Sequence, residues 1–418
     1  MTPGQKRAAA VAIIRAFGLL ACSPLPGCTS QPEQKQAAAP PPPCIKPIVM
    51  AAIGDVMAHG PLQHWASRQP EGYFAVMTRV QDLLQGADVT IANLEGPAAP
   101  NIAPGGMEVA APAARYDGNV YSGHPHFNFH PSIIRDLQRM GVDVLQTANN
   151  HALDRGSLGI DRTLAAMDAA RMPHTGTRRA DARPEGFRWS TSYTVRRDGH
   201  AYRFAFISCA YDTNGLADPH RQVLLCYRPG NEPVANDELL AEIRALRADP
   251  GNVAVIVMPH WGIEGRPRPD IRQTAAAQQM ADAGATAIIG THPHVVQPEA
   301  MLTARDGRRV AVVYSLGNFV SNQTGPGLGL PRRATVISLL GFTPTQDGRL
   351  AATMTGWIPL RMRMGAVFSV DALDRLPEGE AAPYRAHLLR TFAAENKLPA
   401  DPAAYWNRAA APVCAPER

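Results

Sequence analysis

The sequence of 418 residues predicts an α/β fold in which buried, mainly parallel strands alternate with helices. Short and uniformly apolar runs indicate strands that are covered on both faces, because surface helices are longer and show a polar side. Helix-like segments separate several of these runs. A polar cluster follows most of them directly, which is typical of a site built at strand ends. The predicted strands cover residues 48–53, 87–92, 142–148, 253–258, 286–290 and 309–314.

Two helices are predicted by their apolar spacing and by the glycines at their ends. Residues 131–140 carry apolar side chains at helical spacing and stop at Gly141, where a C-terminal cap is expected. Residues 271–283 stop in the same way at Gly284. A predicted strand follows each helix, which is the alternation expected of βαβ units.

Composition divides the chain into four parts. Residues 1–27 have the basic, apolar and small-residue regions of a secretory signal. Residues 28–45 form a tether rich in Pro, Ala and Gln that is too polar to bury a core. Residues 46–330 carry every candidate site cluster and form the main domain. Residues 331–418 are expected to pack on it, with strands near 334–340 and 351–362 and a mostly helical tail containing 383–395.

The N-terminal segment resembles a bacterial lipoprotein signal in which either of two cysteines could carry the lipid. Cys22 and Cys28 both end a short lipobox-like sequence. Lipidation of Cys28 leaves an even number of downstream cysteines that can pair in an oxidising compartment, whereas lipidation of Cys22 leaves an odd number. We favour Cys28 and expect a protein of the periplasm or cell envelope, held to a membrane by a lipid anchor. Simple secretion and a cytoplasmic start are the alternatives.

The remaining cysteines predict two disulfides. Cys209 ends a strand predicted over residues 202–208, and Cys226 follows the next loop, so a bridge between them would staple that loop. Cys44 and Cys414 flank the globular region and could tie its ends together. Buried free cysteines are the alternative.

The charge of the chain gives no case for nucleic-acid binding. The formal net charge is +5, and it falls to +2 without residues 1–27, which hold three basic residues and no acid. The sequence also has no Walker-type phosphate loop and no Gly-x-Ser-x-Gly elbow. These absences argue against nucleotide-cradling and covalent serine chemistry, and we expect Ser315 to line the site rather than attack substrate.

Two carboxylates follow predicted strands directly and are candidate metal ligands. Asp55 follows strand 48–53, with Gly54 permitting close approach of the backbone, although a lone Asp after a strand is more often a helix cap. Glu95 follows strand 87–92, where a carboxylate needs a cation or several hydrogen-bond donors to offset its desolvation.

The next cluster combines amides with an imidazole. Asn149, Asn150 and His151 stand together at the end of strand 142–148. An Asn oxygen is a hard neutral ligand, and a His can donate or accept a proton near neutral pH. A helix start alone would need only one Asn, so a functional role is favoured.

Histidines supply the remaining ligand candidates. His260 follows strand 253–258, while His292 and His294 flank a proline after strand 286–290. Imidazoles one residue apart in extended backbone point to opposite sides, so both can face one metal only if the chain bends there. Three nitrogens suit zinc, manganese or iron better than calcium.

A long loop is expected over the site. Residues 101–128 are rich in Gly, Ala and Pro and have no periodicity. They contain a second His-Pro-His triplet, formed by His124, Pro125 and His126. Because no apolar strand precedes this triplet, we interpret it as lying outside the site.

The polar clusters, taken in order, resemble the motifs of the CapA family of poly-gamma-glutamate capsule biosynthesis proteins. The motifs are Gly54-Asp55-x-Met57, Asn93-Leu-Glu95, Ala148-Asn-Asn-His151-x-x-Asp154-x-Gly156, His260-Trp-Gly-x-Glu264, Gly290-x-His-Pro-His294-Val-x-Gln297 and Ser315-Leu-Gly-Asn-Phe319. The resemblance covers about residues 47–323. That family is similar to calcineurin-like metallophosphoesterases, so the resemblance implies a sandwich of two mixed sheets flanked by helices around a metal centre.

The resemblance also implies roles for individual residues. His151 looks like the catalytic imidazole, and Glu95 stands near the metal-bridging carboxylate of the phosphoesterase pattern. The ligands of one or two divalent ions, with Mn, Zn or Fe favoured, would be Asp55, Glu95, Asn150, His260, His292 and His294. The outer-shell or substrate-contacting residues would be Asn93, Asn149, Asp154, Glu264, Ser315 and Asn318, with Asp154 and Glu264 holding imidazoles.

Two departures from the phosphoesterase pattern weaken one of the two metal positions. Met57 stands where that pattern has a histidine, and Asn93-Leu-Glu95 stands where it has Gly-Asp-x-x-Asp. The centre could hold one firm metal, or a second weak one with His59 as an extra ligand.

Three functions fit these features. The first is a lipid-anchored, metal-dependent phosphoesterase-type hydrolase acting on a phosphoester or an anionic polymer linkage at the envelope. The second is a non-catalytic protein that binds or guides poly-gamma-glutamate or another anionic polymer, together with capsule synthesis or export proteins. The third is an amide-bond hydrolase or transferase. Turnover of a phosphate ester, polymer binding without turnover, and cleavage of a glutamyl polymer would distinguish them.

Overall fold

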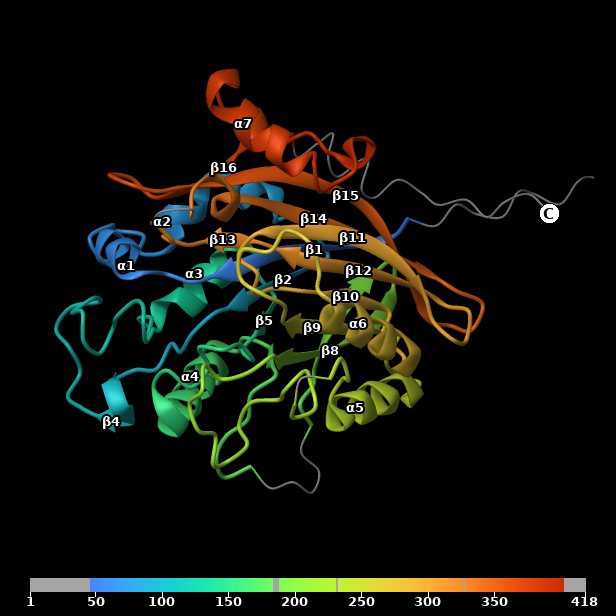
Figure 1. The fold of residues 1–418 in the computed structure, drawn as a ribbon, viewed down its shortest axis with the longest axis horizontal. Coiled ribbons are helices and arrows are strands. Elements are labelled where there is room, and N and C mark those ends of the chain that lie inside the picture. The colour runs from blue at the N-terminus through green and yellow to red at the C-terminus, as the bar shows by residue number, and fades with distance from the viewer. Residues whose placement is uncertain (1–45, 183–187, 231, 326–327, 402–418) are drawn as a thin grey trace, which may run out of the picture. The chain divides into compact units, whose positions relative to one another are not determined.

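Two mixed β-sheets pack face to face, and helices cover their outer surfaces (Figure 1). The computed structural model describes residues 46–401 except 183–187, 231 and 326–327. The predicted α/β sandwich of two mixed sheets flanked by helices is therefore confirmed.

The first sheet has the strand order β16-β15-β14-β1-β2-β5-β6, with β13 paired to β1. Four of its strands run parallel: β1 (Ile48–Val56), β2 (Val89–Leu94), β5 (Val144–Gln146) and β6 (His174–Thr175). Strand β13 (Asn318–Val320) is also parallel to β1. Three strands add an antiparallel side: β14 (Ala334–Pro344), β15 (Leu350–Arg363) and β16 (Ser369–Ala372).

The second sheet has the order β11-β12-β10-β9-β8-β7. Its four central strands are parallel: β8 (His200–Ala210), β9 (Ala254–His260), β10 (Ala287–Ile289) and β12 (Arg309–Leu316). Antiparallel strands close the two edges: β7 (Thr191–Arg197) and β11 (Val296–Thr303). Because the central strands are covered on both faces, their sequences are apolar throughout rather than alternating.

Alternate residues of the same strand face different cores. In β1, Met50 packs into the core between the sheets, whereas Val49 and Ala51 pack outward against helices. The outer cover of the first sheet is α1 (Gly60–Ser67), α2 (Phe74–Met77) and α3 (Ser132–Met140). Helix α4 (Gly156–Ala170) adds Met167 to that cluster. The outer cover of the second sheet is α5 (Asp237–Ala248) and α6 (Ile271–Ala283).

The predicted helix ends are found where the glycines indicated them. Gly141 ends α3 with a left-handed φ of 97°, which a residue without Cβ adopts at little cost. Helix α6 begins after Asp270, which forms a reciprocal capping box with Gln273, and it ends at Gly284 with φ 130°. Each helix therefore ends at a defined residue, and a strand follows it: β5 after α3 and β10 after α6.

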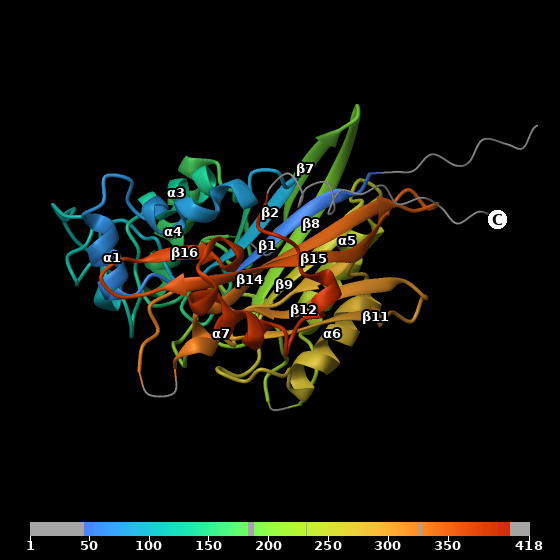
Figure 2. The same ribbon diagram turned by 90° about the horizontal axis from the view of Figure 1, so that it is seen from above.

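The expected boundary near residue 330 falls inside one sheet. Strand β14 pairs directly with β1, so the segment after residue 330 completes the first sheet, as Figure 2 shows, rather than packing on it from outside. The predicted helical tail containing residues 383–395 is present in part: α7 spans Glu378–Leu388 and includes Pro383, and a 3₁₀ turn spans Ala394–Asn396. Glu378 and Glu380 occupy its first turn, where negative charge favours helix initiation.

Short elements complete the described chain. The pair β3 (Ile102–Ala103) and β4 (Met107–Glu108) lies in the loop before α3. Single 3₁₀ turns are η1 (Thr78–Leu83), η2 (Pro104–Gly106), η3 (Leu330–Arg332), η4 (Leu373–Arg375) and η5 (Ala394–Asn396). Within the described ranges, none of the helices has the length and hydropathy that spanning a membrane requires.

One predicted disulfide is present, between Cys209 and Cys226. It joins the end of β8 to the loop that follows, as the sequence indicated. Cys22, Cys28, Cys44 and Cys414 lie outside the described residues, so the lipidation site and the second disulfide stay predictions.

Candidate metal centre

The carboxyl ends of strands from both sheets meet at one place, and the backbone there is unusually close. Asp55 lies near the end of β1, and its N–H donates to the Gly317 carbonyl at 3.0 Å. A Cβ on Gly54 would stand 1.9 Å from the same oxygen, so only glycine fits. This contact brings the end of β1 against the turn that follows β12 of the second sheet.

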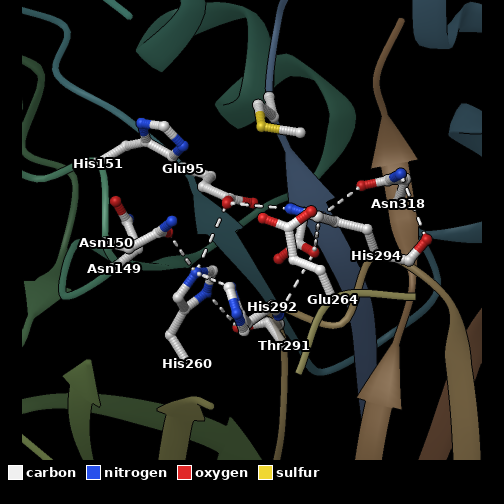
Figure 3. Close-up of polar contacts among 12 residues, drawn as sticks. Glu95, Asn149, Asn150, His151, His260, Glu264, Thr291, His292, His294 and Asn318 are labelled. Carbon is white, nitrogen blue, oxygen red and sulfur yellow. Dashed lines mark hydrogen bonds and ion pairs between the residues drawn. The ribbon is translucent and has the colours of Figure 1, made fainter. Parts of the chain in front are cut away.

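The first candidate ligand group consists of Asp55, Glu95 and His294, all buried (Figure 3). His294 Nδ1 lies 3.1 Å from Asp55 Oδ2, and His294 Nε2 lies 3.6 Å from Glu95 Oε1. One atom from each residue can lie within 4.8 Å of the others. Two carboxylates and an imidazole are a donor set suited to manganese, iron or zinc.

The second candidate group consists of Glu95, His260 and His292, also buried. His260 Nε2 lies 3.5 Å from Glu95 Oε1 and 3.2 Å from His292 Nδ1. Asn150 Oδ1 is 2.8 Å from the same His260 nitrogen. Glu95 therefore belongs to both groups, which is the position of a carboxylate that bridges two cations.

Glu95 is itself the strongest indication that a cation belongs here. Its side chain is fully buried, and neither carboxylate oxygen has a hydrogen-bond partner among the described residues. A buried carboxylate without donors carries a large desolvation cost unless a positive charge offsets it. The residues present thus fit a divalent metal, since a cation between the two groups would satisfy both oxygens.

An unusual backbone conformation allows His292 and His294, which are separated by one residue, to face the same site. His292 has φ 97° and His294 has φ 56°, both in the left-handed region that non-glycine residues rarely adopt. Figure 3 shows the His294 imidazole directed at Glu95 and the His292 imidazole lying against His260. Such strained positions cluster at functional sites, where the surrounding contacts hold them.

The protein's own charges polarise the first group. Burial would raise the pKa of Asp55, but the hydrogen bond and charge of His294 outweigh it and lower that pKa. Burial would lower the pKa of His294, yet Glu95 and Asp55 raise it to about 9. His292 differs, because burial and the neighbouring imidazoles hold its pKa well below the usual value. In the first group, Asp55 is thus an ionised carboxylate paired with a protonated His294. In the second group, His292 is a neutral imidazole that can donate a nitrogen lone pair to a metal.

His151 stands beside the two groups with a carboxylate behind it. Its Nδ1 lies 2.8 Å from Asp154 Oδ2, which also accepts the Phe127 N–H at 2.6 Å. The Phe127 ring packs edge-on against the imidazole, with centroids 4.7 Å apart. Burial acts to lower the pKa of His151, but Asp154 and Glu95 raise it above the usual value. Nε2 is the nitrogen left to act on a ligand.

The predicted outer residues lie around these groups, with different partners. Asn93 donates to Asp55 Oδ1 at 2.8 Å and approaches His260 Nδ1 at 3.2 Å. Asn149 donates to the Leu94 carbonyl at 2.8 Å. Asn318 Oδ1 lies 3.0 Å from His294 Nδ1. Ser315 is directed elsewhere, to the Val295 carbonyl at 2.8 Å, so it supports the backbone of the histidine turn.

Two contacts considered from the sequence are not found among the described residues, although Glu264 and His59 both line the cavity beside His151 and His294. Glu264 makes no hydrogen bond to an imidazole within the described chain; its carboxylate, about half exposed, faces Arg332 Nη1 at 3.3 Å. His59 belongs to neither ligand group, and its Nδ1 contacts the Met57 carbonyl at 3.0 Å and the Asn322 N–H at 3.2 Å. Arg332 lies 68 residues from Glu264 in the chain, so no local pattern could reveal this pair.

The site also includes a segment that the sequence interpretation placed outside it. His124, Pro125, His126 and Phe127 line a cavity of about 330 Å³ together with His151 and His294. The buried Arg155 fixes this loop by donating to the Ser122 hydroxyl and to backbone carbonyls that include those of His126 and Asn119. The repeated His-Pro-His triplet is the signal in the sequence that points to this segment, but the lack of a preceding apolar strand argues against it.

Two further residues were missed. Asn214 accepts a hydrogen bond from Asn150 Nδ2 at 3.0 Å and thereby orients the Asn150 oxygen. The Tyr211 ring packs against His292 with centroids 4.3 Å apart. Both follow β8, in the loop that the Cys209–Cys226 disulfide closes. Neither forms a recognisable motif in the sequence.

Fold and site together define a class of protein: an α/β sandwich with a candidate centre for divalent cations, built from histidines and carboxylates at the strand ends of both sheets. The chain belongs to a particular family within that class, the bacterial capsule synthesis protein PGA_cap family, whose model matches residues 49–323. The predicted relationship to CapA proteins is thereby confirmed.

Curated relatives agree with the family. The chain is 28% identical over 340 residues to the capsule biosynthesis protein CapA of Bacillus anthracis, covering 78% of this chain and 71% of that protein. It is 28% identical over 201 residues to the PGA biosynthesis protein CapA of Bacillus subtilis, covering 47% of each. The chain thus spans about half the length of the second relative.

The solved structures give only a distant likeness. A Staphylococcus aureus protein provisionally assigned as a 5'-nucleotidase shares 11% sequence identity with a TM-score of 0.41, covering 82% of this chain and 58% of that one. A TM-score this low carries no argument about the site or its reaction.

Proposed function

We propose that this protein is a metal-dependent, phosphoesterase-type hydrolase that acts on a phosphoester or anionic polymer linkage during synthesis or export of a capsular polymer such as poly-gamma-glutamate. The observation that carries the proposal is Glu95, a buried carboxylate that is shared by two ligand groups and has no hydrogen-bond partner among the described residues. The family membership and the names of the capsule-synthesis relatives support the polymer context.

The chain's own residues suit hydrolysis. A bound divalent cation would supply stabilisation of an anionic transition state and would acidify water. Asp154 and Phe127 hold His151 in one orientation, and its Nε2 can give a proton to the leaving oxygen. The cavity of about 330 Å³ beside His151 and His294 is large enough for a phosphate group and part of its substituent.

The test is turnover of a generic aryl phosphate ester by the purified protein with Mn²⁺. We expect hydrolysis in the native chain and a loss of roughly 10²- to 10⁴-fold in His151→Ala, which is the usual contribution of a general acid. The matched control is His200→Ala, because His200 is an exposed histidine at the start of β8, away from the centre. The melting temperature of each variant would separate loss of chemistry from loss of folding.

Other outcomes would change the assignment. Absence of turnover across metals and substrates, with poly-gamma-glutamate still bound, would favour a polymer-binding or export-guiding protein. Met57 supports that alternative, since a buried thioether stands where the phosphoesterase pattern has a ligand histidine. Release of glutamate from the polymer, without phosphate ester cleavage, would favour amide hydrolysis.

We also propose that the chain is anchored to a membrane at Cys28 and works in the periplasm or cell envelope beside capsule synthesis or export proteins. The basic and apolar N-terminal segment supports this location, and the Cys209–Cys226 disulfide suits an oxidising compartment. Metabolic labelling with a fatty acid should mark the native protein and Cys22→Ser but not Cys28→Ser. Loss of the label in Cys22→Ser alone would instead assign the lipid anchor to Cys22.

A further inference from the structure

A second cavity lies at the opposite end of the second sheet from the metal centre. It has a volume of about 620 Å³ and is placed where β10 and β12 begin, at the C-terminal end of α5 and beside the β14–β15 turn. Arg247, Arg308, Arg309 and Arg349 line it together with Asp347. Four arginines and one carboxylate thus share a single hollow.

Backbone carbonyls hold two of these arginines in place. Arg308 donates to the Ala285 and Ala281 carbonyls at 2.7 and 2.8 Å, at the end of α6. Arg349 donates to the Asn252 carbonyl at 2.6 Å and the Asp249 carbonyl at 3.1 Å. Guanidinium groups fixed in this way lose little freedom when they bind an anion.

The positive charge of the cavity exceeds the nearby negative charge. Arg247 pairs with Asp347 at 3.2 Å, and Arg308 pairs with Asp306 at 2.6 Å. Within the described chain, the guanidinium groups of Arg349 and Arg309 donate instead to neutral oxygens. Burial lowers the pKa of Arg247, and the charges of Arg308 and Arg349 lower it further, because the guanidinium groups repel each other. An oxyanion would relieve that repulsion.

We propose that this cavity is a second binding site for a chain bearing several carboxylates, the chemistry of the polymer in the proposed function, on which this assignment of the ligand rests. Four guanidinium groups spread over one hollow match a series of carboxylates better than one small anion, because each group forms its own charge-assisted hydrogen bonds. The apolar lining residues Pro344, Leu350 and Ala351 suit the methylene groups between the carboxylates.

The distance between the arginine cavity and the metal centre indicates what the cavity could do. Strand β12 starts at the arginine cavity and ends next to the metal centre, and its eight residues span roughly 25 Å. A monomer cannot reach both places, whereas an extended polymer can. The cavity would therefore hold a long anionic chain on the protein while another part of that chain occupies the metal centre.

The experiment measures binding of fluorescently labelled poly-gamma-glutamate to the purified full chain in the presence of EDTA. The test variant is Arg247→Gln/Arg309→Gln, which removes two cavity charges without removing the carbonyl contacts of Arg308 and Arg349. The matched control is Arg135→Gln/Arg244→Gln, which removes two exposed charges elsewhere, Arg244 lying one turn before Arg247 on α5. Arg309→Gln alone, at an exposed position, guards against misfolding of the double variant.

We expect at least tenfold weaker polymer binding in the double variant, an intermediate loss in Arg309→Gln, and a change below twofold in the control. Equal losses in test and control variants would overturn the proposal, as would no loss in either. Complete competition by equimolar inorganic phosphate or free glutamate would overturn the assignment to a polymer. Aryl phosphate turnover should be unchanged in the double variant, so failure of the hydrolase assay and failure of polymer binding are separate results.

Discussion

Two glutamates, one partly and one fully buried, show how differently this fold treats a carboxylate. Glu299 lies in β11, partly buried, and accepts a hydrogen bond from the Ser338 hydroxyl at 3.1 Å. Burial raises the pKa of Glu299 to about 7, so it avoids charge by taking up a proton. Glu95 is fully buried, has no hydrogen-bond donor among the described residues, and faces His260 and His294 at 3.5 and 3.6 Å.

The difference separates a structural carboxylate from one kept for a ligand. At Glu299 a single hydroxyl and a proton make burial tolerable. At Glu95 the neighbouring groups are imidazoles that can themselves bind a cation, and both carboxylate oxygens are free to join them. We therefore expect Glu299 and Glu95 to respond differently to substitution, although both are glutamates removed at least in part from solvent.

The largest expected effect comes from Glu95→Gln. Because Glu95 belongs to both ligand groups, the amide should weaken Mn²⁺ binding at both positions, by roughly 100-fold or more, since even loss of an outer-shell partner costs about 10- to 100-fold. Isothermal titration with Mn²⁺ measures this loss. Glu299→Gln is the matched control and should bind Mn²⁺ as the native chain does. Native-like affinity in Glu95→Gln would remove the distinction between the two glutamates.

Asp154 is an intermediate case, a buried carboxylate with one satisfied oxygen. Its Oδ2 contacts His151 and Phe127, and its Oδ1 has no hydrogen bond among the described residues. Asp154→Asn should lower kcat for an aryl phosphate by about 10- to 100-fold without changing Mn²⁺ stoichiometry, because Asp154 orients His151 and the Phe127 loop but belongs to neither ligand group. The activity–pH profile should also shift, since the carboxylate raises the pKa of His151. An unchanged kcat would show that His151 needs no carboxylate behind it.

The smallest expected effect is on stability and falls on Glu299. Its pKa is raised on folding, so its contribution to stability is present at pH 4 and is lost as the pH rises through about 7. Glu299→Gln should remove that loss and raise the free energy of unfolding at pH 8, relative to the native chain, by about 1–3 kcal/mol. Urea unfolding at pH 5 and pH 8 tests the sign. A larger benefit of the substitution at pH 5 than at pH 8 would contradict it.

Much of the fold could be predicted because its signals are local. Strands such as β9 and β12 are short apolar runs whose last residues, His260 and Leu316, lie at the site. Gly141 and Gly284 mark helix ends through their own conformational freedom. Neighbouring strand ends meet at one edge of a parallel sheet, so the sequence alone predicts that these candidate ligands lie close together.

The remaining features depend on contacts between distant parts of the chain. The pairing of β14 with β1 joins segments nearly 300 residues apart. The sequence therefore predicts that the C-terminal segment packs on the main domain, whereas it forms part of the first sheet. Surrounding contacts hold the left-handed backbone at His292 and His294, and neither position is a glycine, the residue type that would indicate such a conformation in the sequence. His126 enters the site because Arg155 holds its carbonyl from another segment. The pairing of Glu264 with Arg332 is equally non-local.

The account depends on a cation being held between Asp55, Glu95, His260, His292 and His294. Anomalous diffraction from crystals of the protein grown with Mn²⁺ tests this directly. We predict two peaks on either side of Glu95, one within bonding distance of Asp55 and His294 and the other of His260 and His292. Saturating Mn²⁺ that left no anomalous peak among these five side chains would contradict the account.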